Sequence, residues 1–228
     1  AFSMCAIVFG GTTLMYGTAG SKAEARARAL LGQYSQLVSG QMGGIISMAR
    51  GVAASVEGSI AGPEVDRDQI GRVMSAAIAS WPSLVGMTLV FEPNSVGSDA
   101  AFIGHQYSEP SGRFASAFTV QDGKVSAVVM EEASRNKFAY DLPMQLGRAV
   151  VLPPFTFQAD GVSVTMTTAA VPVQKNGKPV GVVTADVGLN GIAEVIGGLR
   201  PFEVGRVSLI SADGRWIANA DPTLDRKS

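Results

Sequence analysis

The sequence predicts an α+β fold in which a long N-terminal helix precedes an antiparallel sheet, followed by the start of a second module. Residues 21–62 carry apolar side chains at alternating steps of three and four, the pattern of a helix with one buried face. From residue 85 the chain changes to short β-rich runs separated by Asp-Gly and Asn-Gly pairs, which favour hairpins. Helices that precede strands without alternating with them indicate α+β rather than a parallel α/β sheet.

Composition excludes several classes of function. The 228 residues include 18 basic and 19 acidic residues, for a net charge of −1, so the sequence predicts no basic face and no nucleic-acid partner. The single cysteine, Cys5, excludes an intrachain disulfide and a zinc site built from cysteines. No cofactor and no metal site are predicted.

The first 20 residues contain no charged side chain. Because about 20 apolar residues span a bilayer as a helix, residues 1–20 predict the outer end of a transmembrane helix. The run from Gly10 to Thr13 weakens this interpretation, and the core of a signal peptide or an ordinary buried segment are the alternatives.

Residues 21–62 predict one long stalk helix, which would extend about 60 Å. Such a length exceeds what a small domain needs and suits a stalk that rises from a membrane and lines a partner helix. Its six glycines lower helix stability, so they either allow close helix contact or mark a break at Gly43-Gly44. Asp66 opens a second, shorter helix that closes at Trp81-Pro82.

The strands that follow predict an antiparallel meander of five or six. Their expected ranges are Val85–Phe91, Phe114–Val120, Val125–Met130, Val150–Phe157, Val162–Val173 and Val180–Val187, with turns at Asp122-Gly123, Asp160-Gly161 and Asn176-Gly177. A connecting helix at Leu189–Leu199 then leads to a strand-turn-strand over residues 207–219. Since a lone hairpin is marginally stable, residues 189–228 predict a linker helix and the start of a second module.

No catalytic signature is present. The sequence lacks G-x-x-x-x-G-K-[ST], H-E-x-x-H and G-x-S-x-G, the motifs of phosphate loops, zinc proteases and serine hydrolases. The only histidine, His105, follows Gly104 in an expected loop. We interpret it as an exposed or hydrogen-bonded loop residue, so the chain is not predicted to be an enzyme.

Candidate binding residues lie between positions 135 and 186. Asp186 ends an apolar strand, where a carboxylate needs partners; it either caps the next helix or binds a cationic ligand group. Tyr140 and Phe155 either pack in the core or line a small-molecule pocket. Lys137 and Arg135 are either solvated or meet an anionic ligand group.

Several motifs occur in a characteristic order. They are Phe91-Glu-Pro-Asn94, Gly112-Arg113-Phe114, Phe138-Ala-Tyr-Asp-Leu-Pro143, Pro153-Pro-Phe155, Val171-Pro-Val173 and Gly181-Val-Val-Thr-Ala-Asp-Val187. Together they resemble the double-Cache (dCache) extracytoplasmic sensor domains of bacterial methyl-accepting chemotaxis proteins and related sensor kinases. The resemblance implies two PAS-like modules on a long helix, a homodimer anchored in the inner membrane, and a periplasmic ligand site in the membrane-distal module, here residues 63–188.

The resemblance also implies roles for individual residues. Tyr140 matches an aromatic that contacts the ligand, beside Phe138, and Asp186 matches the carboxylate that takes the ligand's amino group. Lys137, Ala139 and Phe155 stand where amino-acid-binding members have Arg, Trp and Tyr, which implies a larger, less polar site. The expected ligand is an amino acid, amine or organic acid; the departures from the motif argue against a standard α-amino acid and leave room for a larger or less polar cation.

The sequence therefore predicts small-molecule sensing by a transmembrane chemotaxis receptor, with the signal passed through helices across the membrane. The alternatives are the sensor of a histidine kinase or diguanylate cyclase, a membrane-anchored hydrolase that uses His105 as its base, and a structural ectodomain without a ligand.

Overall fold

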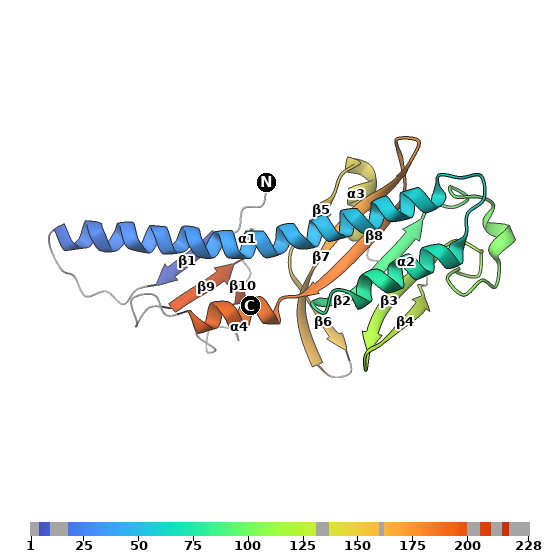
Figure 1. The fold of residues 1–228 in the computed structure, drawn as a ribbon. Coiled ribbons are helices and arrows are strands. Elements are labelled where there is room, and N and C mark those ends of the chain that lie inside the picture. The colour runs from blue at the N-terminus through green and yellow to red at the C-terminus, as the bar shows by residue number, and fades with distance from the viewer. Residues whose placement is uncertain are drawn as a thin grey trace. The chain divides into compact units, whose positions relative to one another are not determined.

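The computed structural model describes residues 5–9, 18–130, 137–159, 162–199, 206–210 and 216–218 (Figure 1). The chain divides into two compact units. One comprises residues 44–152 and 167–187, and the other comprises residues 1–43, 153–166 and 188–228.

Helix α1 (Thr18–Ile60) is a single helix of 43 residues and confirms the long helix expected at 21–62. It runs through Gly43-Gly44 without a break, so the alternative of a broken helix is wrong. From residue 44 onward its buried side chains follow the predicted apolar stripe and include Ile45, Ala49, Val52, Val56 and Ile60. A hydrogen bond from the Gln174 backbone N–H to Glu57 Oε1, 2.7 Å long, joins this part of α1 to the sheet.

Helix α2 (Arg67–Ala79) begins where the sequence predicts. Asp66 is its N-cap, and its Oδ1 accepts a hydrogen bond from the Gln69 N–H at 2.9 Å, which satisfies one of the N–H groups that a helix start leaves free. Ile70, Met74 and Ile78 are buried and form the face with which α2 packs on β2, β3 and β4.

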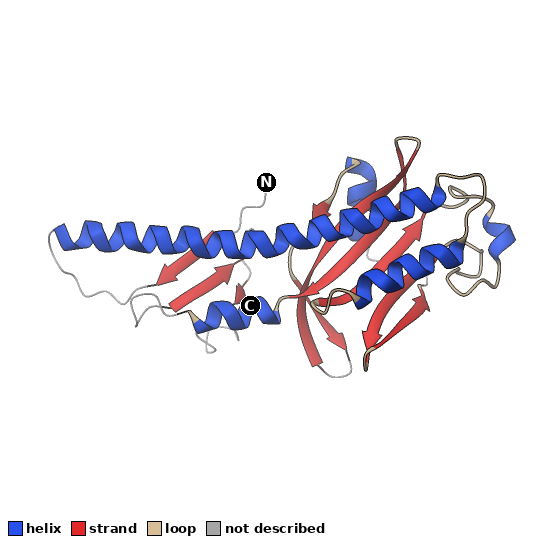
Figure 2. Ribbon diagram, in the orientation of Figure 1, coloured by secondary structure: helices blue, strands red, loops and turns tan. Residues whose placement is uncertain are grey.

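Seven strands form the main sheet of the described residues, in the order β4-β3-β2-β8-β7-β5, with β6 paired to β7 (Figure 2). They are β2 (Leu84–Phe91), β3 (Ala115–Gln121), β4 (Lys124–Val129), β5 (Val150–Val151), β6 (Phe155–Ala159), β7 (Val162–Lys175) and β8 (Lys178–Gly188). The predicted meander is wrong in two respects: the first strand, β2, pairs with the last, β8, and the consecutive strands β4 and β5 lie at opposite ends of the strand order. Long-range pairing of this kind leaves no local signal in the sequence.

Two of the predicted hairpin turns are confirmed by their backbone angles. Asp122 and Gly123 have φ of 50° and 72°, and Asn176 and Gly177 have φ of 53° and 74°, as a two-residue turn with both central residues left-handed requires. Asp160-Gly161 lies outside the described residues, although β6 and β7 pair antiparallel. The strand expected at Val150–Phe157 is divided into β5 and β6, because Pro153 and Pro154 have no N–H for the ladder.

The two faces of the sheet have different neighbours. Met87 and Leu89 are fully buried on the face that α2 covers. On this face the Tyr107 ring centroid lies 5.6 Å from that of Phe118, whose residue is opposite Met87. Because side chains alternate along a strand, Gly86 and Thr88 belong to the other face, which we call the Asp186 face.

The second unit contains a three-stranded antiparallel sheet in the order β1-β9-β10. It is formed by β1 (Cys5–Phe9), β9 (Arg206–Ile210) and β10 (Trp216–Ala218), and helix α4 (Asn190–Gly198) packs on β9 and β10. The predicted connecting helix and the two C-terminal strands are therefore confirmed, whereas the expected turn between these strands lies outside the described residues.

Of residues 1–20 the structure describes 5–9 and 18–20, and these differ from the expected end of a transmembrane helix. Cys5–Phe9 form a strand that pairs with β9, with Cys5 opposite Ile210, and α1 already begins at Thr18. A short apolar run can suit a strand or a helix equally well, and here pairing with β9 decides. No helix among the described residues is both long and apolar enough to cross a bilayer.

Candidate functional site

Asp186 lies near the end of β8, directly opposite Gly86 of β2. Its Oδ1 accepts a hydrogen bond from Thr168 Oγ1 of β7 at 2.5 Å. No described residue donates a hydrogen bond to its Oδ2. The helix-capping alternative is wrong, because Leu189 is the N-cap of α4 and no side chain caps that helix. Among the described residues, the half-buried side chain of Asp186 therefore has one carboxylate oxygen that accepts no hydrogen bond.

Burial raises the pKa of the Asp186 carboxyl, and the hydrogen bond from Thr168 opposes the increase. Burial acts in this direction because it removes water from the charged form. A cation beside Oδ2 would favour the ionised form again. The carboxylate is thus suited to bind a positively charged group.

Small side chains surround Asp186 on its face of the sheet. A Cβ on Gly86 would lie 3.6 Å from Asp186 Oδ2 and 3.9 Å from the methyl carbon of Thr119. Thr88 and Thr184 form the next opposed pair of β2 and β8 on this face, and both are half-buried. The absence of a side chain at position 86 leaves room directly beside the free oxygen.

Tyr140 lies on helix α3 (Lys137–Leu146), and its hydroxyl joins two charged residues. It donates a hydrogen bond to Glu92 Oε1 at 2.5 Å and accepts one from Arg113 Nη2 at 3.2 Å. Burial, followed by the Glu92 carboxylate, raises the pKa of Tyr140 well above its ordinary value, so the hydroxyl stays protonated at neutral pH. Its oxygen is already engaged within the chain, and a ligand would meet its ring.

Tyr140 and Asp186 lie on the same face of the sheet but at different levels. Glu92 continues the alternation of Gly86, Thr88 and Val90, and its N–H donates to the Val180 carbonyl, so Glu92 belongs to the Asp186 face. Six residues separate it from Gly86, a rise of about 20 Å along a strand. The structure therefore does not bring the Tyr140 hydroxyl to Asp186.

The other predicted binding residues lie on α3, on β6 or outside the described residues. Phe138 is 56% exposed and Lys137 is the first residue of α3. Phe155 begins β6 opposite Met166, in the other compact unit, and is half-buried. Arg135 lies outside the described residues.

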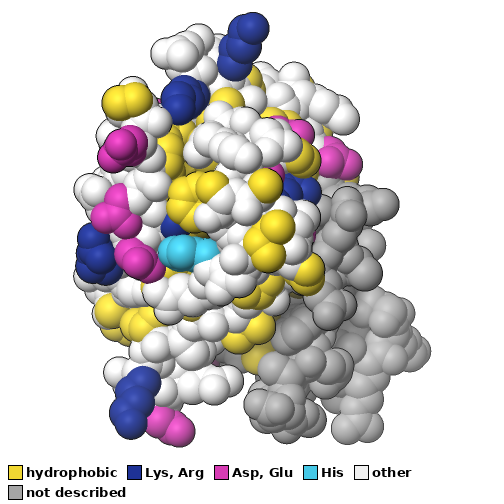
Figure 3. Space-filling view, turned by 90° about the vertical axis from the view of Figure 1, so that its right-hand side faces the viewer, with side chains coloured by type: hydrophobic (Ala, Val, Ile, Leu, Met, Phe, Trp, Pro, Cys, Tyr) yellow, Lys and Arg dark blue, Asp and Glu magenta, His cyan; other side chains and the backbone are white. Residues whose placement is uncertain are grey.

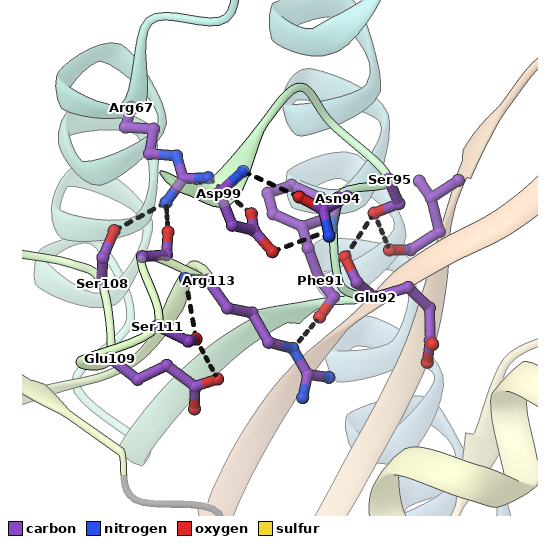
Figure 4. A network of polar contacts seen from close by, with 12 residues as sticks. Arg67, Phe91, Glu92, Asn94, Ser95, Asp99, Ser108, Glu109, Ser111 and Arg113 are labelled. Atoms are coloured by element: carbon purple, nitrogen blue, oxygen red, sulfur yellow. Dashed lines mark hydrogen bonds and ion pairs between the residues drawn. The ribbon is translucent and has the colours of Figure 1, made fainter. Parts of the chain in front are cut away.

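The sequence motifs did not predict the network of buried charges that Arg113 joins to Tyr140 (Figure 4). The guanidinium of Arg67 pairs with Asp99 at 3.0 Å, donates to Ser108 Oγ at 2.6 Å, and also donates to the Gly112 carbonyl. The next residue, Arg113, donates from Nε to the Phe91 carbonyl at 2.5 Å. In the sequence, only the Phe91–Asn94 and Gly112–Phe114 motifs pointed to this part of the structure, and neither shows the periodicity that marks a helix or a strand.

His105 agrees with its prediction as a hydrogen-bonded loop residue. Its Nδ1 accepts a hydrogen bond from the Tyr107 N–H at 3.4 Å, and its Nε2 lies 3.5 Å from Asp68 Oδ1. Figure 3 shows the histidine at the surface with acidic side chains beside it.

A family model and a curated relative each match part of this chain. Residues 70–194 match the family model "Methyl-accepting chemotaxis protein-like, first PDC sensor domain". The methyl-accepting chemotaxis protein TlpQ of Pseudomonas aeruginosa is 28% identical over 174 residues, which cover 68% of this chain and 24% of TlpQ. The chain thus spans about a quarter of the length of this curated relative.

Solved structures share the fold. An extracellular domain assigned to a histidine kinase, mmHK1S-Z2, superposes with a TM-score of 0.77 at 23% identity, covering 90% of this chain and 76% of that one. The ligand-binding domain of the Pseudomonas aeruginosa amino acid chemoreceptor PctC, solved in complex with GABA, gives 0.57 at 16% identity, covering 86% and 74%. The predicted α+β, PAS-like sensor fold is therefore confirmed.

The same kind of sensor domain is indicated by the Cache-like sequence motifs, by the fold and by the family model. Since the model matches more than half of the residues, the chain belongs to the family of methyl-accepting chemotaxis protein-like sensor domains of the first PDC type.

Proposed function

We propose that this chain is the periplasmic sensing part of a membrane-anchored chemotaxis receptor, and that Asp186 binds an ammonium group of its small-molecule ligand. The observation that carries the proposal is the carboxylate of Asp186, which is held by Thr168 at Oδ1 and offers Oδ2 beside the missing side chain of Gly86. A buried carboxylate with one free oxygen gains from a cationic partner more than a solvated one does.

Chemistry supports an ammonium ligand over a purely anionic one. GABA, which occupies the PctC domain, carries an ammonium group at neutral pH. Ala139 is a small residue, 5% exposed, and the Tyr140 hydroxyl is engaged by Glu92 and Arg113. Ala139 and Phe155 stand where amino-acid-binding members have Trp and Tyr, so the ligand we propose is a larger or less polar cation than a standard α-amino acid.

A thermal-shift screen of the purified chain tests the proposal, with a library of amino acids, amines, betaines and organic acids. A ligand at 100 times its Kd adds about 2.7 kcal/mol to the free energy of unfolding. The shift should disappear in Asp186→Asn and persist in Asp141→Asn, because Asp141 is an exposed carboxylate on α3. A well-folded protein that responds to no compound would contradict direct sensing and favour the structural ectodomain.

We further propose a homodimer formed through α1. Gly44, Gly51 and Gly58 are spaced by seven, with Ser47 and Ala54 between them, so the five define a stripe of small residues at heptad spacing. All are exposed or half-buried, and a Cβ on any of the three glycines would meet no atom within 4 Å. Each glycine costs a helix about 0.5–1 kcal/mol relative to alanine, and nothing in the described chain offsets this cost. Close approach of a second α1 helix would offset this cost.

Sensing, rather than catalysis, is the proposed activity. His105, the only histidine, is engaged by Asp68 and the Tyr107 N–H and has no nucleophile motif beside it. The likeness to mmHK1S-Z2 supports a second candidate, in which the same unit controls a histidine kinase. A fusion of this chain to the signalling part of a chemoreceptor should give chemotaxis toward the ligand found in the screen, and a fusion that binds the ligand but gives no response would favour the kinase.

A further inference from the structure

Strand β4 lies at one end of the strand order, and its only neighbour among the described strands is β3 (Figure 1). The Met130 N–H donates to the Ala115 carbonyl of β3. In an antiparallel pair, alternate residues turn their N–H and C=O groups toward the neighbouring strand and away from it. Counting back from Met130, Val125, Ala127 and Val129 therefore turn their backbone groups away from β3, toward the open edge.

The open edge of β4 lacks the features that usually keep other strands away from a sheet. Those features are charges, prolines, bulges and short length. β4 has six residues without a proline, its only charged residue is Lys124 beside the turn, and its register with β3 is unbroken. The opposite edge of the sheet is protected, because β5 has only two residues and Pro153 and Pro154 follow it. β4 is therefore the edge of this sheet that is best suited to accept a further strand.

The side chains of β4 are largely apolar and remain accessible. Val128 is 62% exposed, and Val125 and Val129 are half-buried. The hydroxyl of Ser126 is hydrogen-bonded to Thr119 Oγ1 of β3 at 3.0 Å, which helps to hold β4 in the sheet. An apolar strand that is fixed in a sheet and has unpaired backbone groups fits another strand better than it fits a small molecule.

We infer that the open edge of β4 binds β4 of a second copy of this chain, antiparallel and about a two-fold axis at Ala127. In this register Ala127 is opposite Ala127 of the second copy, and Val125 is opposite Val129 of the second copy. All three outward-facing residues of each copy then exchange hydrogen bonds across the new edge. Because the same surface is used on both copies, the contact closes as a pair.

The sequence of β4 suits pairing with itself. Valine faces valine on one side of the sheet, and opposed β-branched side chains favour strand pairing. On the other side Ser126 lies opposite Val128 of the second copy. The two Lys124 residues lie at opposite ends of the paired strands, about 20 Å apart along the strand direction, so no like charges meet. A second β4 therefore satisfies both the backbone groups and the side chains of this edge.

The β4 edge is a different surface from the small-residue stripe of α1. Helix α1 contacts β7 through the hydrogen bond between the Gln174 N–H and Glu57, and β3, β2 and β8 separate β7 from β4 in the strand order. Pairing through β4 would therefore link one α1 dimer to the next. The inference goes beyond ligand sensing and depends neither on the Asp186 site nor on the α1 dimer.

A charge exchange at the two-fold axis tests the inference. Ala127 is exposed, so a charged side chain there should leave the monomer folded. Ala127→Lys and Ala127→Glu should each weaken self-association about tenfold or more, because like charges then face each other. An equimolar mixture of the two variants should associate again, because opposite charges then meet across the axis. Sedimentation equilibrium at up to millimolar protein measures each dissociation constant.

Two further comparisons make this measurement specific to β4. It is repeated with Gly51→Leu in every chain, which removes the proposed α1 contact and leaves the β4 contact alone. Gln121→Lys and Gln121→Glu are the matched controls, because Gln121 is exposed on β3 but does not lie on the open edge. These controls should associate as the wild type does, both singly and mixed. Thermal melts confirm that each variant is folded.

Amide hydrogen exchange, followed by NMR, gives a second readout that needs no substitution. The N–H groups of Val125, Ala127 and Val129 should exchange quickly in dilute protein and more slowly as the concentration rises. The N–H groups of Ser126 and Val128 face β3 and should be protected at every concentration. Protection of Ala127 that does not depend on concentration would show that another part of the same chain covers the edge, and it would overturn the inference.

The remaining outcomes also decide the inference. If the Gly51→Leu chain stays monomeric at millimolar concentration, or if Ala127→Lys does not weaken its association, β4 does not bind a second copy and the edge is left for a strand of another protein. If both charged variants dissociate but their mixture does not recover, the two-fold pairing at Ala127 is wrong. None of these results bears on Asp186, whose ligand is sought separately by thermal shift.

Discussion

Thr168 donates a hydrogen bond to Oδ1 of Asp186 at 2.5 Å, across two neighbouring strands. This bond holds a half-buried carboxylate in place, and its other oxygen accepts no hydrogen bond from the described residues. Hydrogen bonds to charged groups contribute about 1.5–3 kcal/mol.

Thr168→Val should therefore lower the free energy of unfolding by about 1–3 kcal/mol, because it removes a donor to a buried charge. Urea denaturation of Thr168→Val, Asp186→Asn and the double variant measures the coupling between the two residues. A coupling energy near zero would show that the hydrogen bond contributes nothing to stability.

The stability of the ligand-free protein should depend on pH through Asp186. Burial raises the pKa of this carboxyl above its ordinary value of 3.8, so the native state holds the proton more tightly than the unfolded state. The associated stability is present below the ordinary pKa and is lost as pH rises through the raised pKa. Asp186→Asn does not titrate, so its stability advantage over the wild type should grow from acid to neutral pH. Denaturation curves across this range measure it, and a pH-independent difference would contradict the assignment.

Removing the Tyr140 hydroxyl should destabilise the contact between α3 and the sheet. In Tyr140→Phe, Glu92 and Arg113 each lose a hydrogen-bond partner, for an expected loss of about 1–3 kcal/mol. Urea denaturation gives the value, and hydrogen exchange should show α3 opening more readily than α2. Equal exchange in both helices would mean that the hydroxyl does not anchor α3.

Replacing Arg67 should destabilise the protein strongly. Arg67→Ala leaves Asp99 buried without its ionic partner, and breaking a buried pair in this way costs about 3–5 kcal/mol. Arg72→Ala is the matched control, because Arg72 pairs with Asp66 at the surface at 3.4 Å, where ion pairs contribute little. Similar urea midpoints for the two variants would refute a special role for Arg67.

A bulky residue on the small-residue stripe of α1 should weaken the proposed homodimer. Gly51→Leu places a side chain where nothing within the chain obstructs it, so the monomer should remain folded while close approach of a second α1 is blocked. Sedimentation equilibrium measures the dimer dissociation constant, which should rise at least tenfold. Arg50→Leu, at an exposed position beside the stripe, controls for added apolar surface; an equal effect would argue against the stripe.

Local features of the fold could be predicted because their causes lie within a few residues. The α1 stripe, the Asp66 cap and the turns at Asp122-Gly123 and Asn176-Gly177 depend on periodicity, a single side chain or a left-handed backbone. The predictions were wrong where the structure of a segment depends on pairing with a distant segment. Cys5–Phe9 are a strand because they pair with β9, and β2 is central because it pairs with β8.

For the candidate site, Asp186 could be identified from the sequence alone as a carboxylate at the end of an apolar strand, and Tyr140 as an aromatic residue within a Cache-like motif. The three-dimensional structure was needed to show that Asp186 Oδ2 accepts no hydrogen bond from the described residues, that Gly86, Thr88 and Thr184 lie near it, and that Glu92 and Arg113 engage the Tyr140 hydroxyl. Whether a residue is apolar or polar can be judged from its own position in the sequence. The register between strands is set by hydrogen bonds between segments about 100 residues apart, and no single position carries that information.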